Sequence, residues 1–401
     1  MKNTKTNHVY IFDDLLGNAS MYGIGTYMRE LKKVFSFTGS CKFTIVTLNT
    51  RNKYKNEIND NNIRLIEFPL LLEWSIQNNE KYCRSVAFRL ALSINESENN
   101  IFHFNYMHHL PLATHLKALF PAAKILLVIH FLKSKAYDIE RCFTLLNGMY
   151  KNISESVEQE KHFLNLADDI VVLCSDTKKY IEQQYNINSS KIRTVFNFLK
   201  DRNLPSLRDN RNSLRYKYGF KDTDKLLLYI GRIEESKGIM DFKKVLKELS
   251  VDENLKLVVV GGGEYGRLLS LYPEINTHLI LMGEVHNVSI IDELYCIADI
   301  GILPSYIEQC SYTAIEMMMH GIPIVGLYSF GLKEMFNLIP ISSLHIESSI
   351  PYSHIAMSDL IRDLLDNPTH LRTEGHSNRK KYEKYYSPLN RNIWEELYTI
   401  C

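Results

Sequence analysis

Short, almost continuous apolar stretches recur through the first half of the chain, and patterns typical of helices separate most of them. A run of four to eight apolar residues between polar turns is typical of a strand buried on both faces of a parallel sheet. We expect such strands at His8–Phe12, Lys42–Leu48, Ile63–Phe68, Ile101–Tyr106, Lys124–His130, Asp169–Cys174 and Lys191–Phe196. This alternation predicts a sheet with helices on both faces and with ligand-binding loops at the carboxyl ends of the strands.

A second set of strands and helices begins at Lys225, after a polar stretch that contains a proline, LKDRNLPSLRDNRNS. We place the interdomain linker in this stretch. Further buried strands are expected to begin at Lys225 and to lie at Leu255–Val260, Asp299–Pro304 and Ile322–Leu327, with helices from Ile239 and at Ser311–His320. The pattern therefore predicts two doubly wound α/β domains, residues 1–200 and 201–387.

Composition and charge limit the kinds of protein that this chain can be. The 401 residues are 45% hydrophobic and 23% charged and carry a net charge of +1, as in an ordinary soluble globular protein without an overall field for nucleic acid. Seven cysteines without a C-x-x-C spacing favour free thiols in a reducing compartment over a zinc site. No apolar run approaches the ~18 residues of a membrane span. We therefore expect a cytoplasmic protein with at most peripheral membrane contact.

Two glutamates bracket the turn between a predicted strand and a predicted helix in the second half. Glu308 follows the strand Asp299–Pro304, and Glu316 lies about two turns inside the next helix. Open α/β sheets hold their ligands in the loops at the carboxyl ends of the strands. One carboxylate can therefore face a ligand from the loop while the other reaches it from the helix.

Cationic residues and glycines stand at two other places where a predicted strand passes into a helix. Arg232 and Lys237 lie in the short loop before the helix from Ile239, so both side chains can turn towards one anion, aided by the helix N-terminus. In the first half, Gly23 and Gly25 open a predicted helix, where the backbone can approach a phosphate.

A competing motif, Gly261 to Gly266 in the sequence GGGEYG, satisfies the G-x-G-x-x-G pattern of dinucleotide-binding folds. Glu284, further along the chain, is placed like the acid that binds the ribose in such folds. The motif follows the second strand of its domain rather than the first, and it gives no role to Arg232 or Glu308. An NAD(P)-dependent oxidoreductase is therefore kept as the alternative function.

The acid pair, the sequence HGIPIV after it, and Gly331 followed by Glu334 resemble the nucleotide-sugar site of GT4 glycosyltransferases. The resemblance implies a GT-B fold, two Rossmann-like domains facing each other across a cleft, with the terminal helix 388–401 packing back on the N-terminal domain. It implies transfer of a sugar, with retention and without a metal or other cofactor, from a nucleotide diphosphate sugar to a saccharide, lipid or peptide hydroxyl. A UDP- or GDP-sugar is the expected donor.

The same resemblance implies a role for each candidate residue. Arg232 and Lys237 hold the diphosphate and Glu308 lies beside the transferred sugar. The other candidates also contact the donor: Glu316 at the ribose, Val285 at the base through its backbone, Gly23 and Ser311 near the phosphates, and His130 at the sugar or its phosphate. The family usually has Phe-Gly after the first acid, where this chain has Gln309 and Cys310.

Three further histidines, His108, His109 and His115, lie on a predicted loop and helix with no acid or cysteine at a metal-ligand spacing. We expect them at the surface or on the acceptor side, and we expect no metal site. A third hypothesis is a non-catalytic partner that keeps the fold and binds acceptor for another transferase. Loss of the acid pair or of the two cations would favour it, and both are present.

Overall fold

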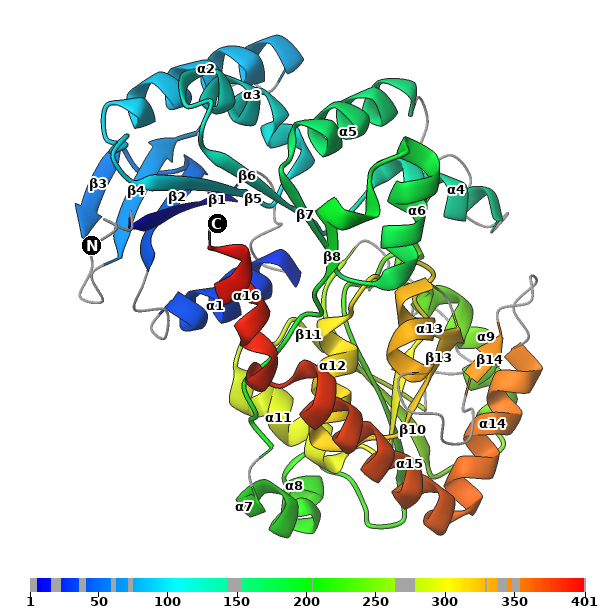
Figure 1. Ribbon diagram of the computed structural model, residues 1–401. Helices are drawn as coiled ribbons and strands as arrows, with labels where there is room; N and C mark the ends of the chain where they lie inside the picture. The colour runs from blue at the N-terminus through cyan, green and yellow to red at the C-terminus, as the bar shows by residue number, and fades with distance from the viewer. Residues whose placement is uncertain are drawn as a thin grey trace. The chain divides into compact units, whose positions relative to one another are not determined.

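A computed structural model describes residues 6–15, 23–35, 41–58, 63–70, 75–142, 153–203, 205–263, 278–328, 330–337, 345–347 and 354–399. The chain forms two compact units, each built around one sheet (Figure 1). Unit 1 comprises Met1–Tyr137, Tyr150–Phe196 and Leu389–Cys401. Unit 2 comprises Asp138–Met149 and Asn197–Pro388.

Unit 1 holds an eight-stranded sheet in the order β3-β4-β2-β1-β5-β6-β7-β8. Its strands are β1 (Asn7–Asp14), β2 (Cys41–Thr50), β3 (Lys55–Ile58), β4 (Arg64–Pro69), β5 (Asn99–Phe104), β6 (Lys124–Ile129), β7 (Asp169–Val172) and β8 (Ile192–Thr194). The pairings are parallel except between β3 and β4. The seven predicted strands are present, and no end differs from its predicted position by more than two residues. Sequence reasoning missed β3 because all four of its residues are exposed and carry no apolar pattern.

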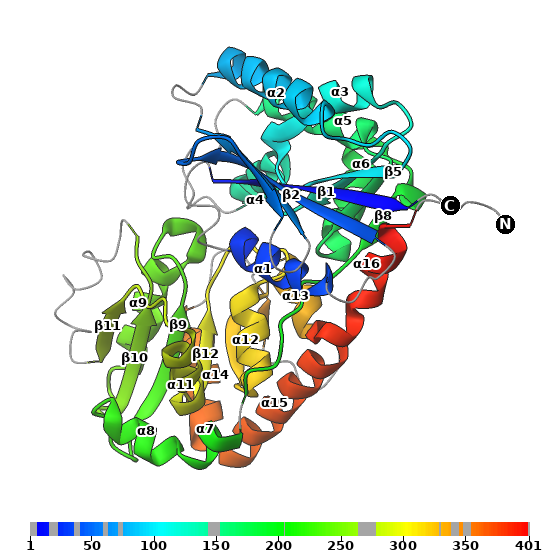
Figure 2. The same ribbon diagram turned by 90° about the vertical axis from the view of Figure 1, so that its left-hand side faces the viewer.

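Helices cover both faces of this sheet (Figure 2). One face is covered by α2 (Ile76–Ala91), α3 (Leu110–Leu119) and α5 (Ser154–Leu166), and the other by α1 (Gly23–Phe35) and α16 (Asn392–Leu397). The unit also contains α6 (Ser175–Tyr185) and the start of α4 (Lys133–Cys142). Neighbouring residues of a strand point to opposite faces, so Phe102 and Phe104 pack under α2 and α3 while His103 lies under α16.

Unit 2 holds a six-stranded sheet in the order β11-β10-β9-β12-β13-β14, with parallel pairings throughout the described strands. Its strands are β9 (Lys225–Ile230), β10 (Leu255–Val260), β11 (Leu279–Gly283), β12 (Ile300–Leu303), β13 (Ile324–Tyr328) and β14 (His345–Glu347). Its helices are α7 (Pro205–Asp209), α8 (Arg211–Lys217), α9 (Ile239–Leu249), α11 (Val288–Ile297), α12 (Tyr312–His320), α13 (Phe330–Asn337), α14 (His354–Asp366) and α15 (Pro368–Lys381). α9 and α14 pack on one face of the sheet, and α11, α12 and α15 lie on the other.

Some predicted helix ends are wrong by a residue or more. Ser311 is the N-cap of α12 and does not start the helix, which begins at Tyr312. The predicted helix after Pro388 is a 3₁₀ turn, Pro388–Arg391, followed by the short α16. From Leu389 onward this segment belongs to unit 1.

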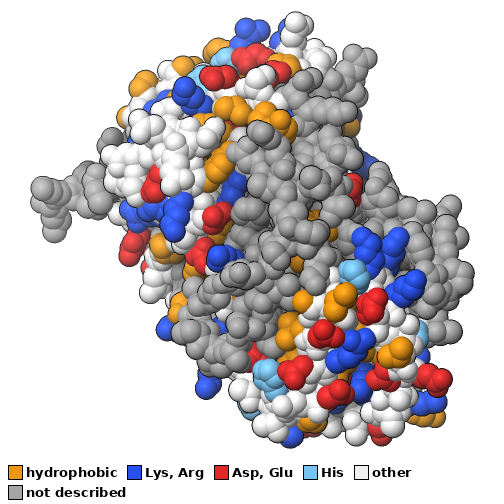
Figure 3. Space-filling model, turned by 90° about the vertical axis from the view of Figure 1, so that its right-hand side faces the viewer, with side chains coloured by type: hydrophobic (Ala, Val, Ile, Leu, Met, Phe, Trp, Pro, Cys, Tyr) orange, Lys and Arg blue, Asp and Glu red, His pale blue; other side chains and the backbone are white. Residues whose placement is uncertain are grey.

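Surface charge is mixed on the face of the molecule drawn in Figure 3, where basic and acidic side chains alternate over the lower part of the view. This pattern fits the net charge of +1. Among the described helices, none combines the length and the apolar character that crossing a membrane requires.

Candidate functional site

In unit 2 the loop after β9 carries the two predicted cations. A 3₁₀ turn, Glu235–Lys237, leads through Gly238 into α9. The ammonium Nζ of Lys237 lies 2.5 Å from Oε1 of Glu308, and Nη1 of Arg232 lies 2.6 Å from Oε2 of Glu234. The first predicted acid and one predicted cation are therefore in direct contact.

The loop after β12 packs against the loop after β9. The amide of Tyr306 donates to the carbonyl of Ser236 (3.0 Å), and the amide of Gly331 donates to the carbonyl of Glu308 (3.1 Å). Ser311 Oγ accepts the amide of Ala314 and so fixes the first turn of α12. These bonds gather a carboxylate, an ammonium and the N-terminus of a helix at the carboxyl ends of β9 and β12, where an anionic ligand is favoured.

Glu316 lies on α12 in a network that sequence reasoning missed. Arg202 donates from Nη2 to Oε1 of Glu316 (2.8 Å), and the Tyr295 hydroxyl donates to Oε2 (3.0 Å). Arg202 also pairs with Asp292 at 3.2 Å. Burial opposes the charge of Arg202, but Glu316 and Asp292 outweigh it and raise the pKa of the guanidinium. Glu316 is thus held in one orientation by two side chains that lie outside its own helix.

The glycines of the G-x-G-x-x-G motif have a packing role. Gly261 and Gly263 adopt φ values of +142° and +143°. A Cβ would lie 1.9 Å from the carbonyl oxygen of Gly231 at the first position and 2.4 Å from that of Ile233 at the second. The glycines thus let the backbone after β10 lie against the segment that carries Arg232. Gly266 lies outside the described residues.

The last unit 2 candidate, Val285, is half-buried and is the second residue after β11. The remaining two candidates belong to unit 1, where Gly23 is the first residue of α1 and His130 follows β6. Nε2 of His130 lies 3.3 Å from Oδ1 of Asn105, and the Tyr27 ring meets the imidazole edge-on at 4.5 Å. Burial lowers the pKa of His130 to about 3, so its ring is neutral at pH 7.

His130 lines a cavity of about 310 Å³ in unit 1, together with Asn105, Tyr106, His108 and Phe131. His103, which the sequence places on the strand beside it, does not line this cavity. Its ring is fully buried, stacks on Trp394 at 5.7 Å, and lies 2.9 Å from the Tyr398 hydroxyl.

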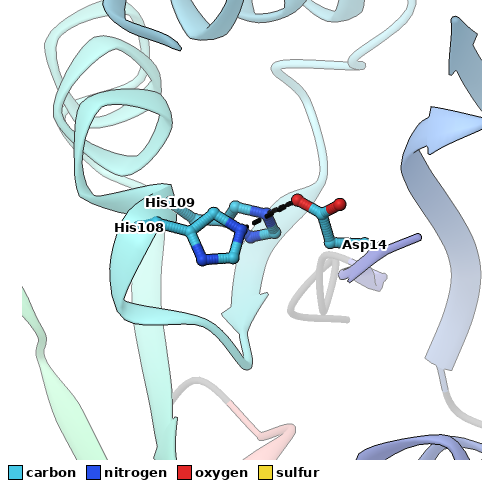
Figure 4. A group of neighbouring side chains, drawn as sticks. All are labelled: Asp14, His108 and His109. Atoms are coloured by element: carbon cyan, nitrogen blue, oxygen red, sulfur yellow. Dashed lines mark hydrogen bonds and ion pairs between the residues drawn. The ribbon is translucent and has the colours of Figure 1, made fainter. Parts of the chain in front are cut away.

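The expectation that His108 and His109 lack an acidic neighbour is wrong. Asp14, at the end of β1, has its Oδ2 2.9 Å from Nε2 of each histidine (Figure 4). His109 is buried rather than exposed. The sequence separation of Asp14 from the histidines hid the cluster, but β1 and β5 pair in parallel, which brings their carboxyl ends together.

Comparison with known proteins identifies the family. Residues 21–201 match the family described as Glycosyltransferase Family 4, and residues 210–384 match Glycosyl transferases group 1. The Salmonella typhimurium lipopolysaccharide 1,2-N-acetylglucosaminetransferase is 31% identical over 180 residues, 41% of this chain and 45% of that protein. The Bacillus anthracis N-acetyl-alpha-D-glucosaminyl L-malate synthase is 26% identical over 147 residues, 36% of this chain and 37% of that protein. The alignments thus span about half the length of these curated relatives, or less.

Solved structures resemble the whole described fold. Sucrose-phosphate synthase from Thermosynechococcus elongatus has a TM-score of 0.78 at 17% identity, over 98% of both chains. Anabaena HepE in complex with UDP-glucose has a TM-score of 0.70 at 12% identity, over 98% of this chain and all of that one. The fold is GT-B, and the chain belongs to the GT4-type glycosyltransferases.

Proposed function

We propose that this glycosyltransferase moves a sugar from a UDP-sugar to a hydroxyl of an acceptor, with retention of configuration. The observation that carries the proposal is the Lys237–Glu308 pair at the carboxyl ends of β9 and β12, on loops that also carry Arg232 and the N-terminus of α12. This set of groups suits a nucleotide diphosphate joined to a sugar.

The choice of donor is supported by the relatives. One curated relative is named an N-acetylglucosaminetransferase and another an N-acetyl-alpha-D-glucosaminyl L-malate synthase, and Anabaena HepE was solved with UDP-glucose. A UDP-sugar is therefore proposed ahead of a GDP-sugar. A saccharide is proposed as the acceptor, ahead of a lipid or a peptide, because a structural neighbour, the Burkholderia xenovorans trehalose-phosphate synthase, was solved with glucose-6-phosphate.

The reaction places negative charge on the leaving diphosphate, and catalysis requires that this charge be stabilised. Lys237 has three N–H donors, so it can keep its bond to Glu308 and still donate to phosphate oxygens. Arg232 adds a second cation from the same loop. Glu308 is assigned to holding the sugar and to electrostatic stabilisation, because the family resemblance implies reaction on the face from which the diphosphate leaves.

Glu316 is proposed to bind the ribose hydroxyls. An ionised carboxylate has about four acceptor positions. Arg202 and Tyr295 occupy two of them, so lone pairs remain on both oxygens for ribose. His130 in unit 1 is assigned to the sugar on the family resemblance, and its neutral ring can donate one hydrogen bond and accept another.

Nucleotide binding by the purified chain tests the donor. UDP is expected to raise the melting temperature, since a ligand at 100 times its Kd stabilises by about 2.7 kcal/mol. Lys237→Ala is expected to raise the Kd for UDP about tenfold to a hundredfold, because hydrogen bonds to charged groups contribute about 1.5–3 kcal/mol. Isothermal titration calorimetry with UDP, GDP, ADP, NAD and NADP measures these constants.

Lys217→Ala is the matched control, since Lys217 also pairs with a glutamate, Glu293 at 2.6 Å, but on the surface of α8. Equal weakening by Lys217→Ala and Lys237→Ala would contradict the assignment. Binding of NAD without UDP would revive the oxidoreductase alternative, which family membership and the packing role of Gly261 and Gly263 oppose. Binding of UDP without release of UDP from any UDP-sugar and saccharide pair would favour the non-catalytic partner.

A further inference from the structure

We propose that Asp14, His108 and His109 of unit 1 bind one divalent transition-metal ion of the Zn²⁺ class. Asp14 ends β1, and the two histidines form the 3₁₀ turn Met107–His109 that follows β5. None of the three belongs to the residues assigned to the donor.

The donor atoms have the spacing that such an ion requires. Both Nε2 atoms lie 2.9 Å from Oδ2 of Asp14, and one ligand atom from each residue lies within 4.8 Å of the others (Figure 4). Adjacent ligands of an octahedral ion with bonds of about 2.05 Å lie about 2.9 Å apart. A tetrahedral ion with such bonds separates them by about 3.3 Å. Small side-chain shifts therefore admit an ion in either geometry.

The chemistry of the ligands selects the class of ion. Two imidazoles and one carboxylate suit Zn²⁺ and its neighbours in the first transition row, whereas Mg²⁺ and Ca²⁺ prefer oxygen ligands alone. The side chains of Asp14 and His109 are each 1% exposed, so two of the three ligands are shielded from bulk water. Because these two side chains are buried, they are already held in place before an ion binds.

Asn49 holds the carboxylate in position. Its Nδ2 lies 2.9 Å from Oδ1 and 3.1 Å from Oδ2 of Asp14. Asn49 is itself buried and has a left-handed backbone, with φ of 56°. Its backbone N–H donates a hydrogen bond to the Tyr82 hydroxyl (3.1 Å), which supports this conformation. Mutation of a residue that orients a metal ligand in this way typically lowers the affinity for the metal 10- to 100-fold.

The site has an entry path on one side. His108 is 34% exposed and lines the 310 Å³ cavity of unit 1. Three protein ligands leave further coordination positions for water, as at metal sites that are not closed by four protein ligands. Nδ1 of His109 has no hydrogen-bond partner among the described residues, so we expect weaker binding than at a closed four-ligand zinc site.

Cobalt titration of the full-length chain, stripped of metal with a chelator, tests the proposal. Co²⁺ is expected to bind with one equivalent and to give visible d–d bands without a thiolate charge-transfer band, and Zn²⁺ is expected to displace it. Asp14→Asn and His108→Gln are expected to raise the Kd at least about 100-fold. Asn49→Gly, which keeps the left-handed backbone available, is expected to raise it about tenfold.

His115→Gln is the matched control, because His115 forms a pair with Glu80 at 2.8 Å without a third ligand among the described residues. It is expected to leave Co²⁺ binding unchanged. Absence of Co²⁺ binding to the unmutated chain overturns the proposal, whatever the variants do. A thiolate band, a preference for Mg²⁺, or equal binding by Asp14→Asn and the unmutated chain also overturns it. Circular dichroism checks that each variant folds, and UDP binding is scored separately, so failure here is distinct from failure of the donor assignment.

Discussion

A neutral imidazole in the core makes the stability of unit 1 depend on pH. Burial, and then the nearby His130, lower the pKa of His103 to about 3. The unfolded chain binds a proton at this position near pH 6.5, so between about pH 6.5 and pH 3 the unfolded state holds the extra proton. The free energy of unfolding therefore falls as the pH decreases through this window.

His103→Gln removes that proton and is expected to flatten the dependence by up to about 1.4 kcal/mol per pH unit. Trp394 stacks on His103 and is one of two tryptophans in the sequence, so its fluorescence in a Trp74→Phe background reports on unit 1 alone. Urea unfolding at several pH values in that background measures the slope. Identical slopes with and without His103 would contradict the expectation, and His115→Gln serves as the control at a half-buried histidine.

Glu316 illustrates what a single sequence can reveal about a site residue. Its place in a predicted helix after Glu308 was enough to predict its element and its candidacy for the nucleotide site, although it lies about one turn into α12 and not the predicted two. Its partners were not predictable, because Arg202 and Tyr295 come from distant segments. The same holds for Asp14, which no local spacing connects to His108 and His109.

Arg202→Ala is expected to raise the Kd for UDP and to destabilise unit 2, since it removes the cation from two carboxylates that are largely buried. We expect losses of about 1–3 kcal/mol both in the free energy of UDP binding and in the free energy of unfolding of unit 2. Calorimetry and thermal unfolding measure the two effects. Arg202→Lys keeps the charge but loses the geometry, so it should recover part of the stability. Unchanged UDP affinity in Arg202→Ala would separate Glu316 from the nucleotide.

At the scale of elements, the backbones of the loops after β9 and β10 pack directly against each other. The apolar runs were sufficient to predict both strands, because burial on two faces leaves few polar residues in them. The glycine motif alone could not distinguish a packing role from dinucleotide binding, because close packing of two backbones and close approach to a phosphate both require a missing Cβ. Only the distances from Gly261 and Gly263 to the neighbouring carbonyls distinguish the two causes.

Gly263→Ala is therefore expected to displace the segment that carries Arg232 and to weaken UDP binding about tenfold or more without touching the nucleotide. Gly219→Ala is the control, since Gly219 also has a positive φ but a Cβ there would meet no atom within 4 Å. Calorimetry with UDP measures both variants. Equal affinities for the two would show that the loop tolerates the added atom.

At the scale of the whole molecule, unit 1 is assembled from separated parts of the chain. Residues 389–401 contribute Trp394 and Tyr398, both buried against the sheet of that unit. The packing of residues 388–401 on the N-terminal domain was predicted from the family resemblance and not from the apolar pattern of the segment. The segment is short, and its apolar residues could cover either domain.

Trp394→Ala is expected to destabilise unit 1 by about 3–5 kcal/mol, as for other large-to-small core changes. Hydrogen exchange followed by mass spectrometry should show faster exchange in β1, β5 and β6 and unchanged exchange in the strands of unit 2. Tyr216→Ala, at a side chain that is 86% exposed, is the control. Uniform acceleration in both units would contradict independent cores.

The discontinuous make-up of unit 1 also sets an order of events during synthesis. A ribosome translates residues 389–401 only after the whole of residues 197–388, so nascent unit 2 can close its core while unit 1 still lacks Trp394 and Tyr398. Domains generally fold in the order in which they emerge. In this chain the unit that begins first is completed last, and until then the face of β5 around His103 lacks the two side chains that cover it in the folded unit.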